Sequence, residues 1–535
     1  MMTAHQHPHR TCPLNELLAG LVAPSVAVQP VPISSLALDS RLASRGGLFL
    51  AYQGSQAHGL DYTRALATRG LRAIAAEPSA RWPRAALDAL ATELEIPIIP
   101  VEHLGAQAGT IAARFYQDPS ARLEMIGITG TNGKTSVSHF IAQGLAHETR
   151  CAVIGTLGQG FPDALVSTGM TTPDALSLQA SLADLAHQGA TAIAMEVSSH
   201  ALAQQRADAV HFDYALLTNL TRDHLDYHQT MEAYAAAKAR LFVHPGLRWA
   251  VLNADEAFSA QLIPTLAPEV RLALYSLNPA LTLDPAVQVR CDLLVRATEL
   301  TLQPRGLRLE VEVDQQRCHE CSLTGTLSAE LVGRFNAANL LAALTLLLAR
   351  GVAFETAVQQ LGRIRGVPGR MESFGAAGEP LCVVDYAHTP DALEQALVEV
   401  RAHCQGQLIL VFGCGGERDR GKRALMGQLA ERLADHIILT DDNPRHEDGD
   451  AIIADIRAGM RPPASQTESK NRPALTIERQ RGVAIRRALL LAGHKDAVLI
   501  AGKGHESEQD MGELRVRFSD RAQVMQALRE WRGRA

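Results

Sequence analysis

A glycine-rich turn followed by a lysine and two hydroxyl residues lies in the segment "MIGITGTNGKTSVSHF", residues 125–140. Backbone N–H groups left accessible by glycines, together with the start of a helix, form a positively polarised site that suits phosphate. Lys134 adds a mobile charge for the β- and γ-phosphates of a nucleotide, and Thr135 adds a hydroxyl that suits Mg²⁺. We therefore predict that this turn binds nucleotide phosphates.

The match to the common pattern G-x-x-x-x-G-K-[ST] is incomplete, because Ile128 stands where the first glycine belongs. Gly127, Gly130 and Gly133 supply a related loop instead. An ordinary glycine turn before a helix is the plainer alternative. We favour phosphate binding because an apolar, strand-like run precedes the loop and a helical pattern follows it. Phosphate binding alone fits a kinase, a motor, a switch or a ligase.

Length and composition narrow the class of protein. A chain of 535 residues is too long for one hydrophobic core and favours about three domains. Its 47% apolar and 20% charged residues are typical of a soluble globular protein, and its net charge of −6 argues against a dedicated nucleic-acid binder. The eight cysteines include one C-x-x-C pair, Cys318 and Cys321, which is a weak indication of zinc. We expect free thiols in a reducing cytoplasm.

No segment indicates export or membrane insertion. The N-terminus lacks the apolar core of a secretory signal. The longest apolar stretch, residues 339–349, is about half the length of a membrane span and is expected to be a buried helix. We therefore expect a cytoplasmic protein.

Strand-like and helical patterns alternate in three blocks. Residues 31 to about 115 predict a small α/β unit, with helical patterns such as that of residues 61–70. From about residue 123, continuous apolar runs separated by helix-compatible sequence predict a doubly wound, mostly parallel sheet. Period-two alternation in residues 285–327 predicts an appended antiparallel portion, and the Gly-, Pro- and Arg-rich stretch 363–374 is a predicted linker.

Each apolar run of the third block ends in a turn rich in polar residues. The runs are 381–388, 407–416, 436–445 and 496–506. Ligands of open α/β sheets bind at the carboxyl ends of the strands, so we expect the chemistry of this block in these turns. The polar stretch 462–473 is expected to be a surface loop or an insertion.

Several further motifs accompany the glycine loop. They are "AMEVSSHAL" (194–202), "TNLTRDHLDYH" (218–228), "GRFNAANLLAAL" (333–344), "VDYAHTPDAL" (384–393), "FGCGGERDRGKR" (412–423), "DDNPRHE" (441–447) and "AGKGHE" (501–506). With these motifs the sequence closely resembles the Mur ligase family, whose members add amino acids to the UDP-linked muramoyl peptide precursor of the bacterial cell wall. The resemblance runs from "LDSR" at residue 38 to residue 506.

The resemblance implies an α/β protein of three domains. These are an N-terminal UDP-precursor-binding domain (1–118), a central P-loop-type ATP-binding domain with a mostly parallel sheet and an added antiparallel portion (119–368), and a Rossmann-like C-terminal amino-acid-binding domain (369–535). It also implies small-molecule substrates, with ATP as co-substrate and Mg²⁺ as cofactor. Nucleic acid and membrane are not expected as partners, and we expect a monomer.

The resemblance assigns an ATP site and a metal site. The implied ATP-binding residues are Gly130, Thr131, Asn132, Gly133, Lys134, Thr135 and Ser136. Glu196 and His224 follow predicted parallel strands, so both should lie beside the loop and ligate Mg²⁺ together with Thr135. Taken alone, a histidine in such a loop is more often a hydrogen-bonded structural residue.

Lys238 matches the lysine that is carbamylated in the family, and its carbamate oxygens would ligate a second Mg²⁺. Burial favours the neutral amine that this modification needs. The implied catalytic residues are Lys134, His224 and Lys238.

The resemblance also assigns residues to the UDP-muramoyl dipeptide. They are Leu38, Ser40, Ser55, Gln56 and Ala57 in the first block, and Thr171, Thr172, Ser198, Gln204 and Arg206 in the second. Arg206 suits a carboxylate of this substrate.

The segment "DDNPR" indicates which amino acid is added. In the family, D-N-P-R at this place is typical of members that add meso-diaminopimelate, and lysine-adding members lack the arginine. Arg445 would clamp the carboxylate at the far end of diaminopimelate, whereas lysine would leave the guanidinium unpaired. Asp442 and Asn443 are expected to accept from the ammonium. The implied set is Arg418, Asp442, Asn443, Pro444, Arg445, Gly502 and Glu506.

The implied reaction is ATP-dependent addition of meso-diaminopimelate to UDP-N-acetylmuramoyl-L-alanyl-D-glutamate through an acyl phosphate. A lysine-adding muramoyl ligase and a folylpolyglutamate-type ligase are alternatives within the superfamily. A nucleotide-binding regulatory protein is the alternative from another class. Its expected signature is the loss of Lys238, Arg445 or His224, and all three are present.

Overall fold

The computed structural model describes residues 11–54, 57–315, 322–461 and 473–533. The chain divides into two compact units: unit 1 is Met1–Leu274 with Pro285–Asp292, and unit 2 is Tyr275–Asp284 with Leu293–Ala535. The boundaries expected for three domains stay a prediction. Across the described residues, no helix combines the length and apolar character that a bilayer span requires.

Unit 1 begins with a four-stranded parallel sheet in the order β3-β4-β5-β6. The strands are β3 Ser35–Ala37, β4 Gly47–Ala51, β5 Ala73–Ala76 and β6 Ile98–Pro100, preceded by the short elements β1 Cys12–Pro13, α1 Leu14–Leu17 and β2 Pro32–Ile33. Helix α3 (Arg84–Leu94) covers one face and α4 (Leu104–Phe115) the other. Phe49 packs toward α3, and its neighbours Leu48 and Leu50 pack toward α4, because successive strand residues point to opposite faces. The predicted small α/β unit is confirmed.

Residues 61–70 do not form one helix. They contain α2 (Thr63–Leu66), with the 3₁₀ turns Gly59–Tyr62 and Ala67–Arg69 on either side. The Thr63 hydroxyl donates to the carbonyl of Leu60 at 2.8 Å, a local bond that competes with a regular helical ladder.

A larger sheet follows in unit 1, in the order β10-β9-β8-β11-β7-β12-β13-β14. The strands are β7 Glu124–Thr129, β8 Cys151–Gly155, β9 Gly158–Phe161, β10 Ala164–Val166, β11 Ala192–Glu196, β12 Tyr214–Leu217, β13 Trp249–Asn253 and β14 Arg271–Ser276. Strands β8, β11, β7, β12 and β13 are parallel, as predicted, whereas β8, β9 and β10 are joined as antiparallel hairpins. The helices are α5 Lys134–Leu145, α6 Ala175–His187, α7 Ser199–Ala203, α8 Leu225–His228, α9 Met231–Ala239, α10 Ala257–Leu262 and α11 Pro285–Arg290.

Unit 2 contains the antiparallel portion that period-two alternation predicted. Strand β16 (Gly306–Asp314) pairs antiparallel with β15 (Cys291–Gln303) and with β17 (Ser322–Ala329). Helix α12 (Arg334–Arg350) is almost entirely buried, as expected for residues 339–349. Helix α13 (Phe354–Leu361) follows it.

The rest of unit 2 is a six-stranded sheet in the order β18-β19-β23-β20-β21-β22. Its strands are β18 Glu372–Phe374, β19 Leu381–Asp385, β20 Leu408–Phe412, β21 His436–Leu439, β22 Ala474–Ile477 and β23 Ala497–Ala501. All pairs are parallel except β18 with β19. The four predicted strands are confirmed, and the predicted linker 363–374 ends in the edge strand β18 rather than in a free connection.

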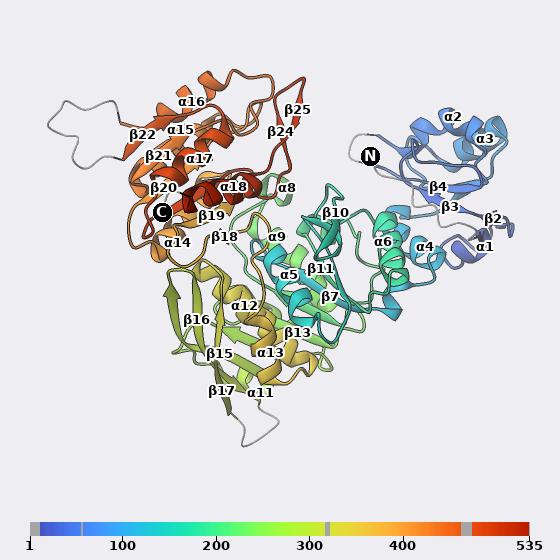
Figure 1. The fold of residues 1–535 in the computed structure, drawn as a ribbon. Coiled ribbons are helices and arrows are strands. Elements are labelled where there is room, and N and C mark those ends of the chain that lie inside the picture. The colour runs from blue at the N-terminus through green and yellow to red at the C-terminus, as the bar shows by residue number, and fades with distance from the viewer. Residues whose placement is uncertain (1–10, 55–56, 316–321, 462–472, 534–535) are drawn as a thin grey trace. The chain divides into compact units, whose positions relative to one another are not determined.

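Helices cover both faces of this sheet. One face packs against α14 (Pro390–His403), α15 (Gly421–Leu433) and α16 (Gly449–Arg457). The other packs against α17 (Arg481–Leu491) and α18 (Asp520–Arg532), which lie side by side (Figure 1). This three-layer arrangement leaves the strand ends free for polar groups, and a short hairpin of β24 (Glu508–Asp510) and β25 (Arg515–Arg517) follows β23.

Candidate functional site

The glycine loop joins β7 to α5 in unit 1, as the sequence predicted. Gly130 has φ +147°, and a Cβ there would lie 1.9 Å from the Thr218 hydroxyl oxygen. Gly133 has φ +85° and directly precedes the first helical residue, Lys134. Only glycine meets both conditions at position 130, and the helix start directs backbone N–H groups at the loop.

The end of β12 fixes the shape of the loop. The Asn132 backbone N–H donates to Asn219 Oδ1 at 2.9 Å, and Asn219 Nδ2 donates back to the Asn132 carbonyl at 3.2 Å. The Thr218 hydroxyl donates to the same carbonyl at 2.6 Å. Because neighbouring parallel strands β7 and β12 end at one edge of the sheet, the residues after β12 hold the loop in place.

Two lysines meet at one carbonyl of the loop. Lys134 Nζ donates to the Gly130 carbonyl at 2.8 Å, and Lys238 Nζ, from α9, donates to it at 2.7 Å. Lys238 is only 1% exposed and lies over the ring of Tyr234, 4.4 Å from its centroid. Burial and, secondarily, the charge of Lys134 lower the pKa of Lys238 to about 6. Lys238 is therefore a neutral amine near pH 7, as carbamylation requires.

Glu196, at the end of β11, lies beside the loop as predicted. Its buried carboxylate accepts from the Thr135 hydroxyl at 3.0 Å and from the Thr156 backbone N–H at 2.8 Å. Hydroxyl and carboxylate oxygens are the donors that Mg²⁺ prefers, so Thr135 and Glu196 suit a magnesium ion. Within the described residues, however, no group of three or more His, Cys, Asp or Glu side chains is arranged to hold a metal.

His224 lies in the same neighbourhood but touches neither Glu196 nor Thr135 in any hydrogen bond found among the described residues. It has φ +52°, and its Nε2 lies 3.5 Å from a carboxylate oxygen of Asp223. Its ring centroid lies 4.9 Å from that of His200 and 6.2 Å from that of Tyr234. Since the Tyr234 hydroxyl is 3.1 Å from that of Thr131, Tyr234 links His224 to the phosphate loop.

The predicted precursor-binding residues of the second block form one cluster. The Thr171 hydroxyl is 3.1 Å from that of Thr156. The Thr172 hydroxyl donates to the Glu196 carbonyl and lies 3.4 Å from the Ser198 hydroxyl. Arg206 donates to Gln204 at 2.9 Å and to the Thr172 carbonyl at 3.1 Å. Hydrogen bonds therefore connect Glu196, through Thr172, to the guanidinium of Arg206.

The predicted residues of the first block lie at the carboxyl ends of two parallel strands. Leu38 and Ser40 follow β3, and Ala57 follows the neighbouring β4. Ser55 and Gln56 lie outside the described residues. Tyr52 directly follows β4 at this edge of the sheet. Burial and the charge of Asp174 raise the pKa of Tyr52, and the charge of Arg206 acts to lower it. Arg206 is therefore close enough to this edge to act on it electrostatically.

In unit 2, the segments "DDNPR" and "AGKGHE" lie side by side after β21 and β23. Asn443 Nδ2 donates to Glu506 Oε2 at 2.9 Å, and a Cβ on Gly502 would lie 2.4 Å from Asp442 Oδ2. Burial raises the pKa of Asp442, although Arg481 and Lys503 act to lower it. The predicted residues Asp442, Asn443, Gly502 and Glu506 are thus one group.

Arg445 adjoins this group. Its backbone has φ +52°, its guanidinium donates to the Gly416 carbonyl at 2.6 Å, and its Nε lies 3.8 Å from Asp510. Pro444 packs against the same loop, because a Cβ on Gly416 would lie 1.9 Å from the Pro444 carbonyl oxygen. The exposed Arg418 follows in that loop. The structure therefore brings all seven predicted residues into one region of unit 2.

Sequence reasoning missed several residues of these sites. Tyr234 precedes Lys238 by four positions, a spacing that places both on one face of α9. Asn219 lies two residues after the end of β12, and polar residues at the carboxyl ends of parallel strands are candidates for a ligand site. Lys503 is a charge between two glycines at the end of an apolar strand, and Asp510 lies on the hairpin that follows. Asn219 and Lys503 each follow a buried parallel strand, and this position could have identified them as candidate site residues.

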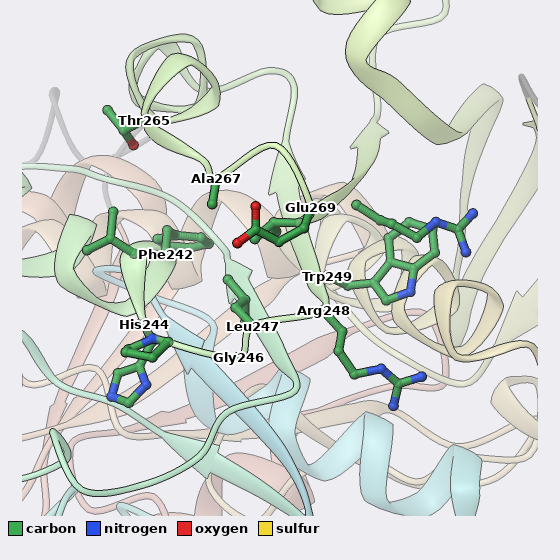
Figure 2. A pocket seen from close by; sticks show the side chains of 13 residues that line it. Phe242, His244, Gly246, Leu247, Arg248, Trp249, Thr265, Ala267 and Glu269 are labelled. Atoms are coloured by element: carbon green, nitrogen blue, oxygen red, sulfur yellow. The ribbon is translucent and has the colours of Figure 1, made fainter.

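A cavity of about 620 Å³ lies elsewhere in unit 1 (Figure 2). It is lined by residues of 242–249 and 265–271 and by none of the predicted site residues. Its arginines already have partners: the Arg271 guanidinium lies 4.0 Å from the centroid of Trp249, and Arg248 lies 3.7 Å from Asp213. We do not assign the substrates to it.

Family comparisons agree with this architecture and with these sites. Residues 32–116 match the model of "Mur ligase family, catalytic domain", residues 128–347 that of "Mur ligase middle domain", and residues 369–504 that of "Mur ligase, glutamate ligase domain". The chain belongs to the Mur ligase family, a family of ATP-dependent ligases.

Its relatives include proteins named UDP-N-acetylmuramoyl-L-alanyl-D-glutamate–2,6-diaminopimelate ligase. The one from Alkalilimnicola ehrlichii is 48% identical over 504 residues, which cover 94% of this chain and 96% of that protein. The one from Coxiella burnetii is 45% identical over 499 residues, covering 93% and 96%. A solved structure of a ligase with this name is 34% identical, with a TM-score of 0.69 and coverage of 98% and 99%.

Proposed function

We propose that this chain is the ATP-dependent ligase that joins meso-diaminopimelate to UDP-N-acetylmuramoyl-L-alanyl-D-glutamate in the synthesis of peptidoglycan precursors. The observation that carries the proposal is the pairing of unlike charges in unit 2. The guanidinium of Arg445 lies 3.8 Å from Asp510, whose backbone N–H donates to Asn443, and Asn443 in turn donates to Glu506. An amino-acid head group carries one carboxylate and one ammonium, which is the complement of that pair.

The first step activates a carboxylate. An oxygen of the D-glutamate side chain attacks the γ-phosphorus of ATP, the bond from that phosphorus to the bridging oxygen breaks, and ADP leaves with the bond's electron pair. Lys134 would exchange its bond to the Gly130 carbonyl for the transferring phosphoryl group. The helix start at α5 and the loop N–H groups would bind the phosphates that remain on ADP. No side chain of the protein forms a covalent bond in this step. The protein positions the substrates and stabilises charge, so the reaction requires no protein nucleophile.

A bound Mg²⁺ would supply charge neutralisation for the phosphates. Thr135 and Glu196 would hold it, because they already present a hydroxyl and a carboxylate to each other. A carbamylated Lys238 would hold a second ion, since its amine is buried and neutral beside the loop. The imidazole of His224 could serve as a further metal ligand. The ring of Tyr234 lies between it and the loop.

The second step forms the amide. The amine of diaminopimelate attacks the acyl carbon, the carbon–oxygen bond to phosphate breaks, and the amine loses a proton as phosphate departs. Arg445 would bind the distal carboxylate, and a carboxylate of the same group would bind the distal ammonium. Lysine lacks that carboxylate, and binding it would bury an unpaired guanidinium.

Further properties of the protein are part of the proposal. We propose the three domains 1–118, 119–368 and 369–535, a cytoplasmic location and a monomeric state. The precursor would be bound by Arg206 and its cluster, with Leu38, Ser40 and Ala57 at the uridine end.

The proposal is tested by phosphate release from ATP in the presence of the UDP-muramoyl dipeptide. Each amino acid of a panel that contains meso-diaminopimelate, L-lysine and L-glutamate is supplied alone. We expect release that depends on diaminopimelate and on the UDP precursor together. Equal release with lysine would favour the lysine-adding alternative, and release without the UDP precursor would favour a folylpolyglutamate-type ligase.

A further inference from the structure

Lys503 is a buried charge that the reaction proposed above does not use. It lies two residues after β23, and its side chain is 0% exposed. Its Nζ donates to Asn443 Oδ1 at 2.8 Å and to Glu506 Oε2 at 2.7 Å. A buried ammonium is costly unless it is paired, so these two bonds account for its presence. Both partners are residues assigned to the amino acid.

The bonds of Lys503 decide which way the amide of Asn443 faces. Oδ1 accepts from Lys503 and also from the backbone N–H of Asp510, at 2.9 Å, which uses both of its lone pairs. Nδ2 then donates to Glu506 Oε2. Asn443 has no acceptor left for an ammonium, in contrast to the expectation from the sequence.

Glu506 is consequently the acceptor that remains. Its Oε2 is engaged by Lys503 and by Asn443, while no group among the described residues donates to its Oε1. The side chain is 31% exposed, so Oε1 is accessible to a ligand. The two donors on Oε2 fix the plane of the carboxylate and thereby the direction of Oε1.

We propose that Lys503 is a positioning residue for the incoming amino acid, which holds Glu506 so that Oε1 receives the distal ammonium and turns Asn443 from an acceptor into a donor. The inference rests on the proposed function. It adds to that function an orienting residue behind the groups that touch the substrate.

The charge of Lys503 also governs the protonation of Glu506. Burial alone would raise the pKa of Glu506, but hydrogen bonds from Lys503 and Asn443 and the charge of Lys503 lower it below its usual value. The other titratable groups that act with it in this region are His505, Asp442, Arg481 and Tyr386. Without Lys503, Glu506 would take up a proton at a higher pH and lose its hold on the ammonium.

The test compares the full-length protein with K503M and with the matched control K495M, which removes an exposed lysine of the same unit. Steady-state constants for diaminopimelate, ATP and the UDP precursor are measured from pH 5 to 9. For K503M we expect a KM for diaminopimelate about 10- to 100-fold higher, because a hydrogen bond to a charged group is lost. The KM values for ATP and the UDP precursor should be unchanged. The acid limb of kcat/KM for diaminopimelate should move to higher pH, because Glu506 loses the hydrogen bond and the charge that lower its pKa. K495M should match the wild type.

An unchanged KM for diaminopimelate with an unchanged acid limb in K503M would overturn the inference. If K503M does not fold, K503R decides the matter, because it keeps the charge but not the geometry. The inference predicts that K503R raises the KM for diaminopimelate and leaves the KM values for ATP and the UDP precursor unchanged, and an unchanged KM for diaminopimelate in K503R contradicts it. A wild type that shows no diaminopimelate-dependent phosphate release would instead defeat the proposed function itself.

Discussion

Lys134 and Lys238 donate to the same carbonyl oxygen, that of Gly130, at 2.8 and 2.7 Å. Two cations at one oxygen repel each other, so one of them gives up its proton more easily. Lys238 is that residue, because it is the buried one. The loop therefore has the side chain of Lys134 beside a buried amine, that of Lys238, whose pKa is lowered.

Replacing Lys238 with methionine should reveal this shift in a stability measurement. The folded-state pKa of Lys238 is about 6, against 10.5 for an unperturbed lysine, so between these values the unfolded chain binds a proton that the folded chain does not. Wild-type stability relative to K238M should therefore rise with pH across this window, by at most about 1.4 kcal/mol per pH unit. Denaturant unfolding in buffer freed of carbon dioxide measures it.

The exposed lysine variant K495M is the control, and its stability difference from the wild type should not change with pH. A difference for K238M that is equally flat would show that Lys238 is not neutral in the folded protein.

Gly130→Ala should abolish nucleotide binding. The added Cβ would lie 1.9 Å from the Thr218 hydroxyl oxygen, at a φ of +147° that is unfavourable for alanine. Gly20→Ala is a matched control, because its φ of +71° is also left-handed but no atom lies within 4 Å of the added carbon. Calorimetry with ATP should detect no binding to the first variant and wild-type binding to the second. Retained ATP affinity in G130A would contradict the assignment of the loop.

Much of the fold and of the site follows from local sequence. Strands β7, β11, β12 and β23 are apolar runs of buried residues, so their existence and the clustering of the polar residues after them could be predicted. Strand β22 is only four residues long and largely exposed, and β24 and β25 are short and mostly polar, so none stands out as a buried apolar run.

Contacts between distant segments could not be predicted. Lys238 reaches a carbonyl 108 residues away, and Lys503 reaches Asn443 across 60 residues. Such hydrogen bonds depend on three-dimensional packing and leave no periodic pattern. The sequence alone therefore predicts that Asn443 accepts from a ligand, whereas in the structure its side-chain oxygen already accepts from Lys503 and Asp510.

Arg445→Ala should weaken the selection of the amino acid. The variant loses a charged contact to the distal carboxylate, so its KM for diaminopimelate should rise about 10- to 100-fold. Its activity with lysine should rise, because lysine no longer leaves a guanidinium unpaired. Arg432→Ala, which removes an exposed arginine paired with Glu394, is the control. Parallel assays with the two amino acids measure the effect. An Arg445 variant with wild-type discrimination would rule out the guanidinium as the selecting group.

The buried pair Arg481–Asp520 should be costly to break on one side only and should add little net stability to unit 2. Both side chains are 0% exposed, with Nε to Oδ1 at 2.7 Å, and Arg481 also donates to the Ala501 carbonyl at 2.9 Å, just before Gly502. R481M alone leaves a buried carboxylate unpaired and should cost about 3–5 kcal/mol of unfolding free energy. R481M/D520L removes both charges and should recover most of that loss in denaturant unfolding. A double variant as unstable as R481M would contradict this explanation.

A competition assay tests the central claim most directly. Purified protein receives ATP, the UDP-muramoyl dipeptide with ¹⁸O in the D-glutamate side chain, and equal concentrations of meso-diaminopimelate and L-lysine, and the products are weighed by mass spectrometry. We expect the diaminopimelate adduct in large excess, with one ¹⁸O transferred to each phosphate released. A lysine adduct in equal amount, or phosphate without the label, would contradict it.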